Sequence, residues 1–235
     1  MPTEGYFAPE PEGLPEPLPA DPLPTLATWL DEAAQRGVQP NSNAMCLATA
    51  DLRGRPAARI VLCKRLVVDP GFLVFYTSYT SRKGIELAAN PHAAAVLHWD
   101  TLGRQARIEG PVVCSPAAES DAYFTSRSWR SQLGAVASAQ SRPIASRQAM
   151  RDRVRAAAAK LGIADLDELP REGARPVEIA RPSDWGGYRL WIETVELWVA
   201  GAARVHDRAK WSRKLGAERA GSFEPGAWSP GRLQP

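Results

Sequence analysis

The segment Arg204-Val205-His206-Asp207-Arg208 carries residue types that bind and act on an anionic ligand. Alternate side chains of a strand share one face, so Arg204, His206 and Arg208 are predicted to project together. They would span about 13 Å at roughly 3.3 Å per residue. Two fixed cations beside an imidazole favour an anionic ligand over a position in the core. The alternative interpretation is a solvated strand face with an ordinary run of charges.

The segment Thr80-Ser81-Arg82-Lys83 is a second candidate anion site, because it stands at the start of a predicted helix. The first turn of a helix offers free N–H groups and the positive end of the helix dipole. A capping hydroxyl and two adjacent cations make phosphate the natural ligand. An ordinary serine cap with two surface cations is the alternative.

Arg59 and Lys64 bracket the apolar run Ile60, Val61, Leu62 and Cys63. Ideal alternation places the two cations on opposite faces of a strand, so both serve one ligand only if the strand twists, bulges or ends there. The alternative is that both are surface residues at strand ends.

A further phosphate site is predicted from Tyr123, Arg127 and Ser131. Tyr123 and Arg127 stand four residues apart and share a helix face, which combines a phenol and a guanidinium. Alone, this pattern is equally typical of a surface pair. Uncharged donors and acceptors that suit the pyrimidine edge of a flavin come from Gln105, Gln140 and Ser141. Trp198 ends an apolar run and is by itself more typical of a core.

Other chemistries find no support in the spacing of residues. The histidines show neither an HExxH pattern nor Cys/His ligand spacing, so no metal site is expected. Glycine-rich dinucleotide and phosphate loops and the GxSxG pattern are likewise missing from the sequence.

These residues are carried by short predicted strands and helices. Residues 1–24 are rich in proline and are expected to form an extended or mobile arm, followed by one domain over residues 25–235. Several short strands separated by turn signals favour a barrel or sandwich. Strands are predicted at 44–50, 57–64, 72–77, 93–99, 105–113, 187–198 and 203–210, helices at 25–36, 81–89, 116–127 and 145–161, and loops at 162–184 and 215–232.

Composition is typical of a soluble globular protein, with 235 residues, 44% hydrophobic residues and a formal charge of +3. This charge is too small to indicate nucleic acid binding. The apolar runs are too short to span a bilayer, and no secretory signal is visible. Three cysteines without CxxC spacing indicate a reducing compartment, so we expect a cytoplasmic enzyme.

In order, the segments resemble the pyridoxamine/pyridoxine 5'-phosphate oxidase family. The matching pieces are NAMCLATAD, RIVLCK, VFYTSYTSRKG, NPHAAAVLHW, RQARIEGPV, YFTSRSWRSQLGA, QSRPIASR, WGGYRL, VELW, RVHDR and the closing RLQP. The resemblance runs from about residue 20 to the C-terminus and implies a mainly β fold with flanking helices (α+β), a homodimeric FMN-binding split β-barrel.

The resemblance also implies roles for individual residues. FMN would be bound by Arg59, Ile60, Val61, Leu62, Lys64, Tyr76, Thr77, Arg82, Lys83, Gln105, Gln140, Ser141, Trp198 and Arg208. The substrate phosphate would be bound by Lys64, Tyr123, Arg127 and Ser131, with Arg204 and His206 as the catalytic pair beside the substrate ring.

The activity that the resemblance implies is oxidation of pyridoxamine or pyridoxine 5'-phosphate to pyridoxal 5'-phosphate by O2, with release of H2O2. The alternatives are a flavin oxidase of another metabolite, as in phenazine biosynthesis, and a non-catalytic flavin- or pyridoxal-phosphate-binding protein. The sequence departs from the family in its arm, which has Tyr6 but no arginine before Arg36, and in the longer segments 162–184 and 212–230. The resemblance therefore implies no residue of this arm that would cover the substrate.

Overall fold

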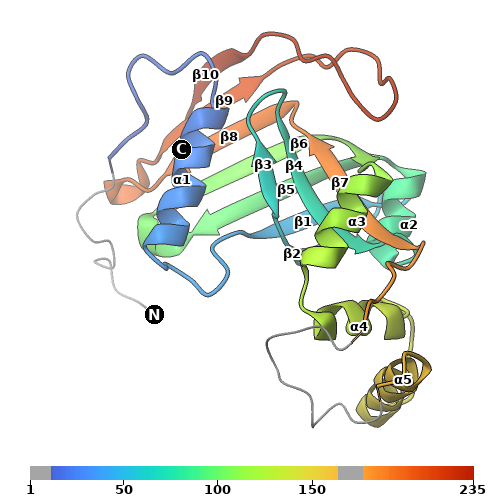
Figure 1. Ribbon diagram of the computed structural model, residues 1–235. Coiled ribbons are helices and arrows are strands. Elements are labelled where there is room, and N and C mark those ends of the chain that lie inside the picture. The colour runs from blue at the N-terminus through green and yellow to red at the C-terminus, as the bar shows by residue number, and fades with distance from the viewer. Residues whose placement is uncertain (1–11, 164–176) are drawn as a thin grey trace.

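The computed structural model of the chain describes residues 12–163 and 177–235 (Figure 1). The expectations for residues 1–11 and for most of the loop at 162–184 lie outside the described residues. Among the helices of the described ranges, none has the length and apolar character needed to cross a bilayer.

Five α-helices and two short 3-10 turns occur in the described ranges. They are α1 (Leu23–Gln35), α2 (Arg82–Ala89), α3 (Ala117–Ser126), α4 (Trp129–Ala137), α5 (Arg147–Lys160), η1 (Asp100–Leu102) and η2 (Ala202–Arg204). The strands are β1 (Ala44–Ala50), β2 (Pro56–Leu62), β3 (Arg65–Val67), β4 (Phe72–Ser78), β5 (His92–Trp99), β6 (Arg104–Cys114), β7 (Trp185–Trp191), β8 (Thr194–Val199), β9 (Asp207–Ser212) and β10 (Ser229–Leu233).

The strands pair in the order β10-β9-β8-β6-β5-β1-β2, and β7, β4 and β3 branch from β6. The branch arises because β6 is long and pairs with two partners in turn. Its residues 104–109 pair with β8, and its residues 112–114 pair with β7. Gly110 lies between the two stretches, where a Cβ atom would meet the Trp191 carbonyl oxygen at 1.9 Å. Only glycine allows this close approach of the backbones.

The barrel closes through the link between β2 and β3. The Lys64 amide donates to the Val74 carbonyl of β4 at 2.8 Å, while the Cys63 amide donates to Asn43 at 2.9 Å. Strands β1, β5, β6, β7, β4 and β3 thus return to β2. The architecture confirms the predicted mainly β barrel with flanking helices.

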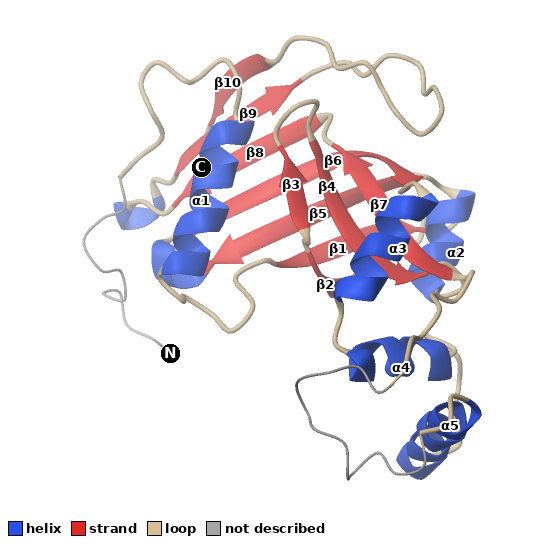
Figure 2. Cartoon of the chain, viewed as in Figure 1, coloured by secondary structure: helices blue, strands red, loops and turns tan. Residues whose placement is uncertain are grey.

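The core fills the barrel with alternate side chains of its strands. Met45, Leu47, Leu97 and Ile108 are completely buried, in agreement with the period of two. Helix α1 adds buried Leu23, Leu26, Trp29 and Ala33 at helical spacing. Figure 2 shows α1 at one end of the barrel, with α2 and α3 at the other and α4 and α5 beyond them.

Two strand predictions were wrong in their extent. The run 187–198 is not one strand, because the chain turns a corner at Ile192 and Glu193 between β7 and β8. The predicted strand 203–210 begins only at Asp207, because η2 occupies its first residues. Strand β3, helix α4 and strand β10 were not predicted, and β10 falls in a segment that was expected to be a loop.

Residues 12–22 of the proline-rich arm lie against β9 and β10. The Leu14 amide donates to Asp207 Oδ2 at 2.7 Å, and Trp211 Nε1 donates to the Pro19 carbonyl at 2.8 Å. Arg232 of β10 pairs with Asp207 and with Glu16, the latter at 2.9 Å. These contacts hold the arm beside the segment that precedes β9.

Candidate functional site

Lys83 is a buried cation in the first turn of α2. Ser81 caps this helix by accepting from the Gly84 amide at 3.3 Å. Lys83 Nζ donates to Thr77 Oγ1 and Gln140 Oε1, both at 2.8 Å, and to Ser81 Oγ at 3.2 Å. The side chain is 7% exposed. Burial, assisted by the charge of Arg59, lowers the pKa of Lys83 from 10.5 to about 8.

Glu86 joins the two other predicted phosphate-binding cations. Its carboxylate pairs with Arg59 at 3.1 Å and with Arg82 at 2.8 Å, so that strand β2 and helix α2 are linked. Arg59 also donates to Thr49 Oγ1 at 2.6 Å. The hydrogen bonds from Thr49 and the two arginines outweigh burial and lower the pKa of Glu86. One carboxylate between two arginines leaves a positive balance, to which Lys83 adds.

A stack of aromatic rings lies next to this group. The rings of Tyr76 and Tyr123 are 3.8 Å apart and nearly parallel, and Trp185 stacks on Tyr76 at 5.7 Å. The guanidinium of Arg127 lies 4.8 Å from the centre of the Trp185 ring. Tyr76 and Thr77 are consecutive residues of β4, so the stack and the Lys83 group lie on opposite faces of the same strand.

Arg127 is a cation without a carboxylate partner among the described residues. Its Nη1 atom is buried and makes no hydrogen bond within those ranges, and burial lowers the pKa of the guanidinium. Lys64 Nζ lies 5.9 Å from the ring of Tyr123, since β2 has ended at Leu62 and the chain has turned toward β3. Ser131 lies in the first turn of α4, where its Oγ is 2.8 Å from that of Ser128. Lys64, Tyr123 and Arg127 thus lie around the aromatic stack, while Ser131 lies at the start of α4.

Gln105, Trp198 and Arg208 form a row across three strands. The register pairs Gln105 of β6 with Trp198 of β8, and Trp198 with Arg208 of β9. Arg208 donates to Glu196 Oε1 at 2.8 Å, and the same carboxylate accepts from Arg107 at 3.0 Å. The ring of His206 lies 4.6 Å from that of Trp198. The strand register therefore places Gln105, Trp198 and Arg208 side by side.

The predicted single face of Arg204, His206 and Arg208 is wrong. Arg204 is exposed and lies in η2, and both Ala203 and Arg204 have left-handed backbones with φ of 52° and 62°. His206 immediately precedes β9, and Arg208 is within it. The tight turn breaks the alternation on which the prediction depended.

The remaining residues that were predicted to bind the cofactor lie at the end of β2 and between α4 and α5. Ile60 is 65% exposed on β2, whereas Val61 and Leu62 are half-buried. Gln140 and Ser141 lie between α4 and α5, and Ser141 has a left-handed φ of 68°.

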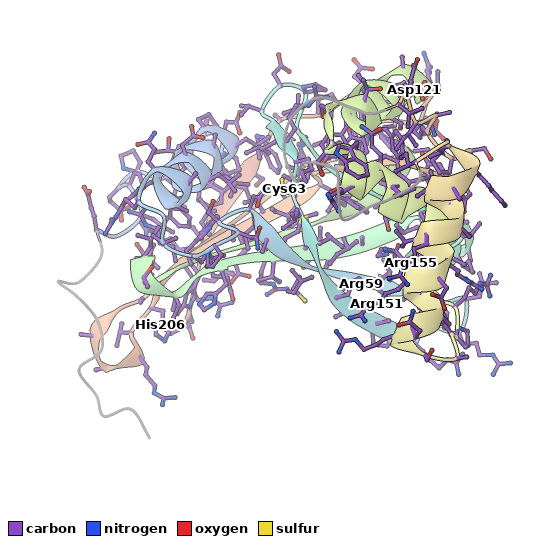
Figure 3. The ribbon with its side chains drawn as sticks, turned by 60° about the horizontal axis from the view of Figure 1, so that its bottom comes forward. Arg59, Cys63, Asp121, Arg151, Arg155 and His206 are labelled. Carbon is purple, nitrogen blue, oxygen red and sulfur yellow. The ribbon has the colours of Figure 1, made fainter. Side chains whose placement is uncertain are left out.

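Within one chain, the Lys83 group and the Trp198 row do not meet. Strands β1, β5, β6 and β8 separate β2 from β9, which corresponds to about 24 Å at roughly 4.8 Å per strand. Figure 3 shows Arg59 and His206 well apart along the sheet.

Comparison with known proteins identifies the family. A family model described as pyridoxamine 5'-phosphate oxidase matches residues 30–160. A second, described as the pyridoxine 5'-phosphate oxidase C-terminal dimerisation region, matches residues 185–235. The chain is 46% identical over 197 residues to the pyridoxine/pyridoxamine 5'-phosphate oxidase of Gluconobacter oxydans, covering 83% of this chain and 90% of the relative. The chain belongs to the pyridoxamine 5'-phosphate oxidase family.

Other relatives agree with this assignment. The oxidase of the same name from Paraburkholderia phytofirmans is 43% identical and covers 92% of this chain and 89% of its own length. Among solved structures, PhzG from Burkholderia lata, in complex with tetrahydrophenazine-1-carboxylic acid, superposes with a TM-score of 0.75 at 30% identity, covering 92% of this chain and 94% of its own. The predicted family, the split barrel and the assignment as an oxidoreductase are thereby confirmed.

Four residues of this family member were not singled out from the sequence. Glu86 carried a signal, because it stands four residues after Arg82 on a predicted helix. Trp185 stood inside a matching motif without a role of its own. Glu196 likewise stood inside the matching piece VELW, and its role depends on strand register. Gly201 gave no signal, because its role depends on a turn.

Proposed function

We propose that the protein catalyses FMN-dependent oxidation of pyridoxamine and pyridoxine 5'-phosphates to pyridoxal 5'-phosphate, with O2 as the acceptor. The observation that carries the proposal is a pair of cationic groups, one with the buried Lys83 and one with the half-buried Arg127, and neither cation contacts a carboxylate among the described residues. Lys83 contacts only neutral oxygens, and Arg127 keeps a buried N–H atom without an acceptor. Two phosphates, one on the cofactor and one on the substrate, would satisfy both.

The residues at Lys83 fit the phosphate of FMN. A buried ammonium surrounded by hydroxyl and amide oxygens carries a desolvation cost that an anion would offset. Arg59 and Arg82 stand behind it, positioned by Glu86. The start of α2 adds N–H groups and the helix dipole. Lys64, Tyr76 and Thr77 are assigned to the same cofactor, and Gln140 and Ser141 would supply neutral contacts for it.

The flavin ring is assigned to a space between two subunits of a homodimer. Arg208 on β9 lies five strand spacings, about 24 Å, from Arg59 on β2 along the sheet. The exposed side chain of Ile60 on β2 suits contact with a flavin or a second subunit. The match of residues 185–235 to a dimerisation region supports the same arrangement.

The substrate phosphate is assigned to Lys64, Tyr123, Arg127 and Ser131. The Arg127 guanidinium lies 4.8 Å from the centre of the Trp185 ring, and its buried Nη1 atom has no acceptor among the described residues, so a phosphate could accept from it. A lysine in its place would supply the charge but not this geometry. Arg204 and His206 are assigned to the substrate ring.

Bound FMN would supply the two-electron oxidation of C4' and the transfer of the electrons to O2, with H2O2 as the product and with water replacing the nitrogen of the amine substrate, which leaves as ammonia. The residues of this chain bind and orient both molecules. The aromatic stack and the barrel wall exclude water from one side of the site.

The proposal is tested by assaying the purified protein for H2O2 with pyridoxamine 5'-phosphate and with pyridoxamine lacking the phosphate. We expect turnover with the first and at least tenfold weaker kcat/KM with the second. A yellow protein without turnover would instead support the non-catalytic flavin-binding alternative.

A phenazine-type oxidase is the second candidate, favoured by the superposition with PhzG. Under that alternative, a tricyclic carboxylate would be oxidised and Arg127 would bind a carboxylate. A direct comparison of reduced phenazine carboxylate and pyridoxamine 5'-phosphate as substrates separates the two. A higher kcat/KM for the phenazine would overturn our assignment.

We further propose that the enzyme acts in the cytoplasm. Cys46, Cys63 and Cys114 are all free thiols. This state suits a reducing compartment.

A further inference from the structure

The state of the His206 ring is set by an N–H group of the backbone. The amide of Gly201 donates to His206 Nδ1 at 3.2 Å. An atom that accepts a hydrogen bond has a lone pair there and no proton. In the neutral ring, the single proton is therefore on Nε2. The tilted Trp198 ring, 4.6 Å away, limits rotation of the imidazole.

The carboxylates near this ring are engaged elsewhere. Asp207, the next residue, accepts from the Leu14 amide at 2.7 Å and pairs with Arg232. Glu196 is bound by Arg107 and Arg208. A histidine that acts as a base commonly donates its second N–H to a carboxylate, which supports the charged ring. His206 has the opposite arrangement, because its Nδ1 atom accepts a hydrogen bond from the Gly201 amide and donates none.

We propose that His206 serves the reaction as a hydrogen-bond donor through Nε2–H, and that Gly201 is the positioning residue that fixes this state. The inference rests on the proposed function, in which His206 lies beside the substrate ring. Nε2 already carries a proton and therefore takes none from the substrate's amine or hydroxyl group as the hydride leaves C4'. A second proton would have to enter at Nδ1, where it would displace the hydrogen bond from Gly201.

The turn requires glycine at this position. A Cβ atom on residue 201 would lie 1.9 Å from the Val205 carbonyl oxygen. The backbone closes this tightly because Ala203 and Arg204 are both left-handed, and the Val205 amide bonds to Ala202 at 2.9 Å. Two consecutive non-glycine residues with positive φ are unusual, and such strain is concentrated at functional sites.

The first test reads the protonation of the ring directly. The FMN-loaded protein is labelled with 15N-histidine, and two-bond 1H–15N correlations are recorded near neutral pH. The chain has three histidines, and loss of one set in His206→Gln assigns the signals. We expect the Nε2–H form for His206, and a shift toward a mixture of both forms in Gly201→Ala. A dominant Nδ1–H form, or no change in Gly201→Ala, would overturn the proposal.

The second test uses two substitutions that place an amide at different ring positions. A glutamine nitrogen reaches the place of Nε2, whereas asparagine keeps an acceptor for Gly201 but does not reach that far. We expect kcat to fall about tenfold in His206→Gln and about 100-fold or more in His206→Asn, because a lost hydrogen bond costs about a factor of ten to 100. Equal losses, or no loss in either, would refute the donor role.

The outcomes separate this inference from the proposed function. If the wild-type protein fails to oxidise pyridoxamine 5'-phosphate, the proposed function and the donor role toward the substrate both fall. The role of Gly201 would still stand or fall by the NMR result. If turnover is present and the tautomer is Nδ1–H, the inference alone fails.

Discussion

Replacing Lys83 with methionine tests whether this buried cation is held for an anion. Its pKa of about 8, compared with an ordinary 10.5, means that the folded chain without FMN disfavours the charged amine. The difference corresponds to about 3 kcal/mol at roughly 1.4 kcal/mol per pKa unit. Because the side chain is 7% exposed, little of this is lost to screening by solvent.

The sign of the pH dependence follows from proton binding. Below pH 8 the amine is protonated in both the folded and the unfolded chain, so the penalty is present in full. Between pH 8 and 10.5 the unfolded chain keeps a proton that the folded chain has released. The free energy of unfolding of the FMN-free protein should therefore rise over this window, by up to about 3 kcal/mol. Lys83→Met should remove this rise.

The affinity for FMN should fall over the pH range in which the free energy of unfolding rises. A phosphate beside Lys83 favours the charged amine, so FMN should bind more weakly as the pH rises above 8. Loss of one charge-assisted hydrogen bond is worth about 1.5–3 kcal/mol, so Lys83→Met should raise the Kd by about ten- to 150-fold.

The measurements are urea unfolding of the FMN-free protein from pH 7 to 10.5 and titration of FMN by quenching of its fluorescence. Lys160→Met is a matched control, because Lys160 is an exposed lysine at the end of α5. A Kd within about threefold of the wild type, together with an unchanged pH slope, would show that Lys83 is a structural cation.

Three other substitutions test separate parts of the site. Arg127→Ala should raise the KM for the phosphorylated substrate by about ten- to 100-fold and leave the Kd of FMN unchanged, whereas equal losses would contradict the division of roles. Glu196→Gln should lower the free energy of unfolding by about 1–3 kcal/mol and weaken FMN, because it releases Arg208, and an unchanged denaturation midpoint would count against this. Arg232→Ala should free the arm, so that cleavage after Glu12 by a glutamate-specific protease becomes faster, and equal rates would show that the arm is held without this ion pair.

Local features of the site were predictable from the sequence. The cap at Ser81 and the position of Lys83 in the first turn depend on neighbours within four residues. The end of β2 before Lys64 was the condition under which Arg59 and Lys64 could serve adjacent ligands, and the structure meets it. Helix caps and strand ends depend on residues close together in the sequence, so they can be predicted without knowledge of the rest of the fold.

Features that depend on long-range contact were not predictable. The corner between β7 and β8 exists because Gly110, far away in sequence, admits the carbonyl of Trp191. The failure at Arg204 has a similar cause, because the left-handed residues there are an alanine and an arginine, for which positive φ is uncommon. No sequence pattern marks such a turn. The pairing of Glu196 with Arg107 and Arg208 likewise depends on strand register.

The separation of the two groups along the sheet constrains the proposed dimer. In a two-fold dimer, a surface patch of one subunit contacts either the same patch or a different patch of the partner. A contact between two different patches occurs twice, because the axis repeats it. If the β2 end of one chain meets the β8–β9 end of the other, the same contact is repeated by the axis, and two complete sites result. Ile60 and Val205, which are 65% and 69% exposed, lie at these two ends. Apolar exposure at both ends is what an interface that joins them requires, whereas an axis through one end would leave the other exposed.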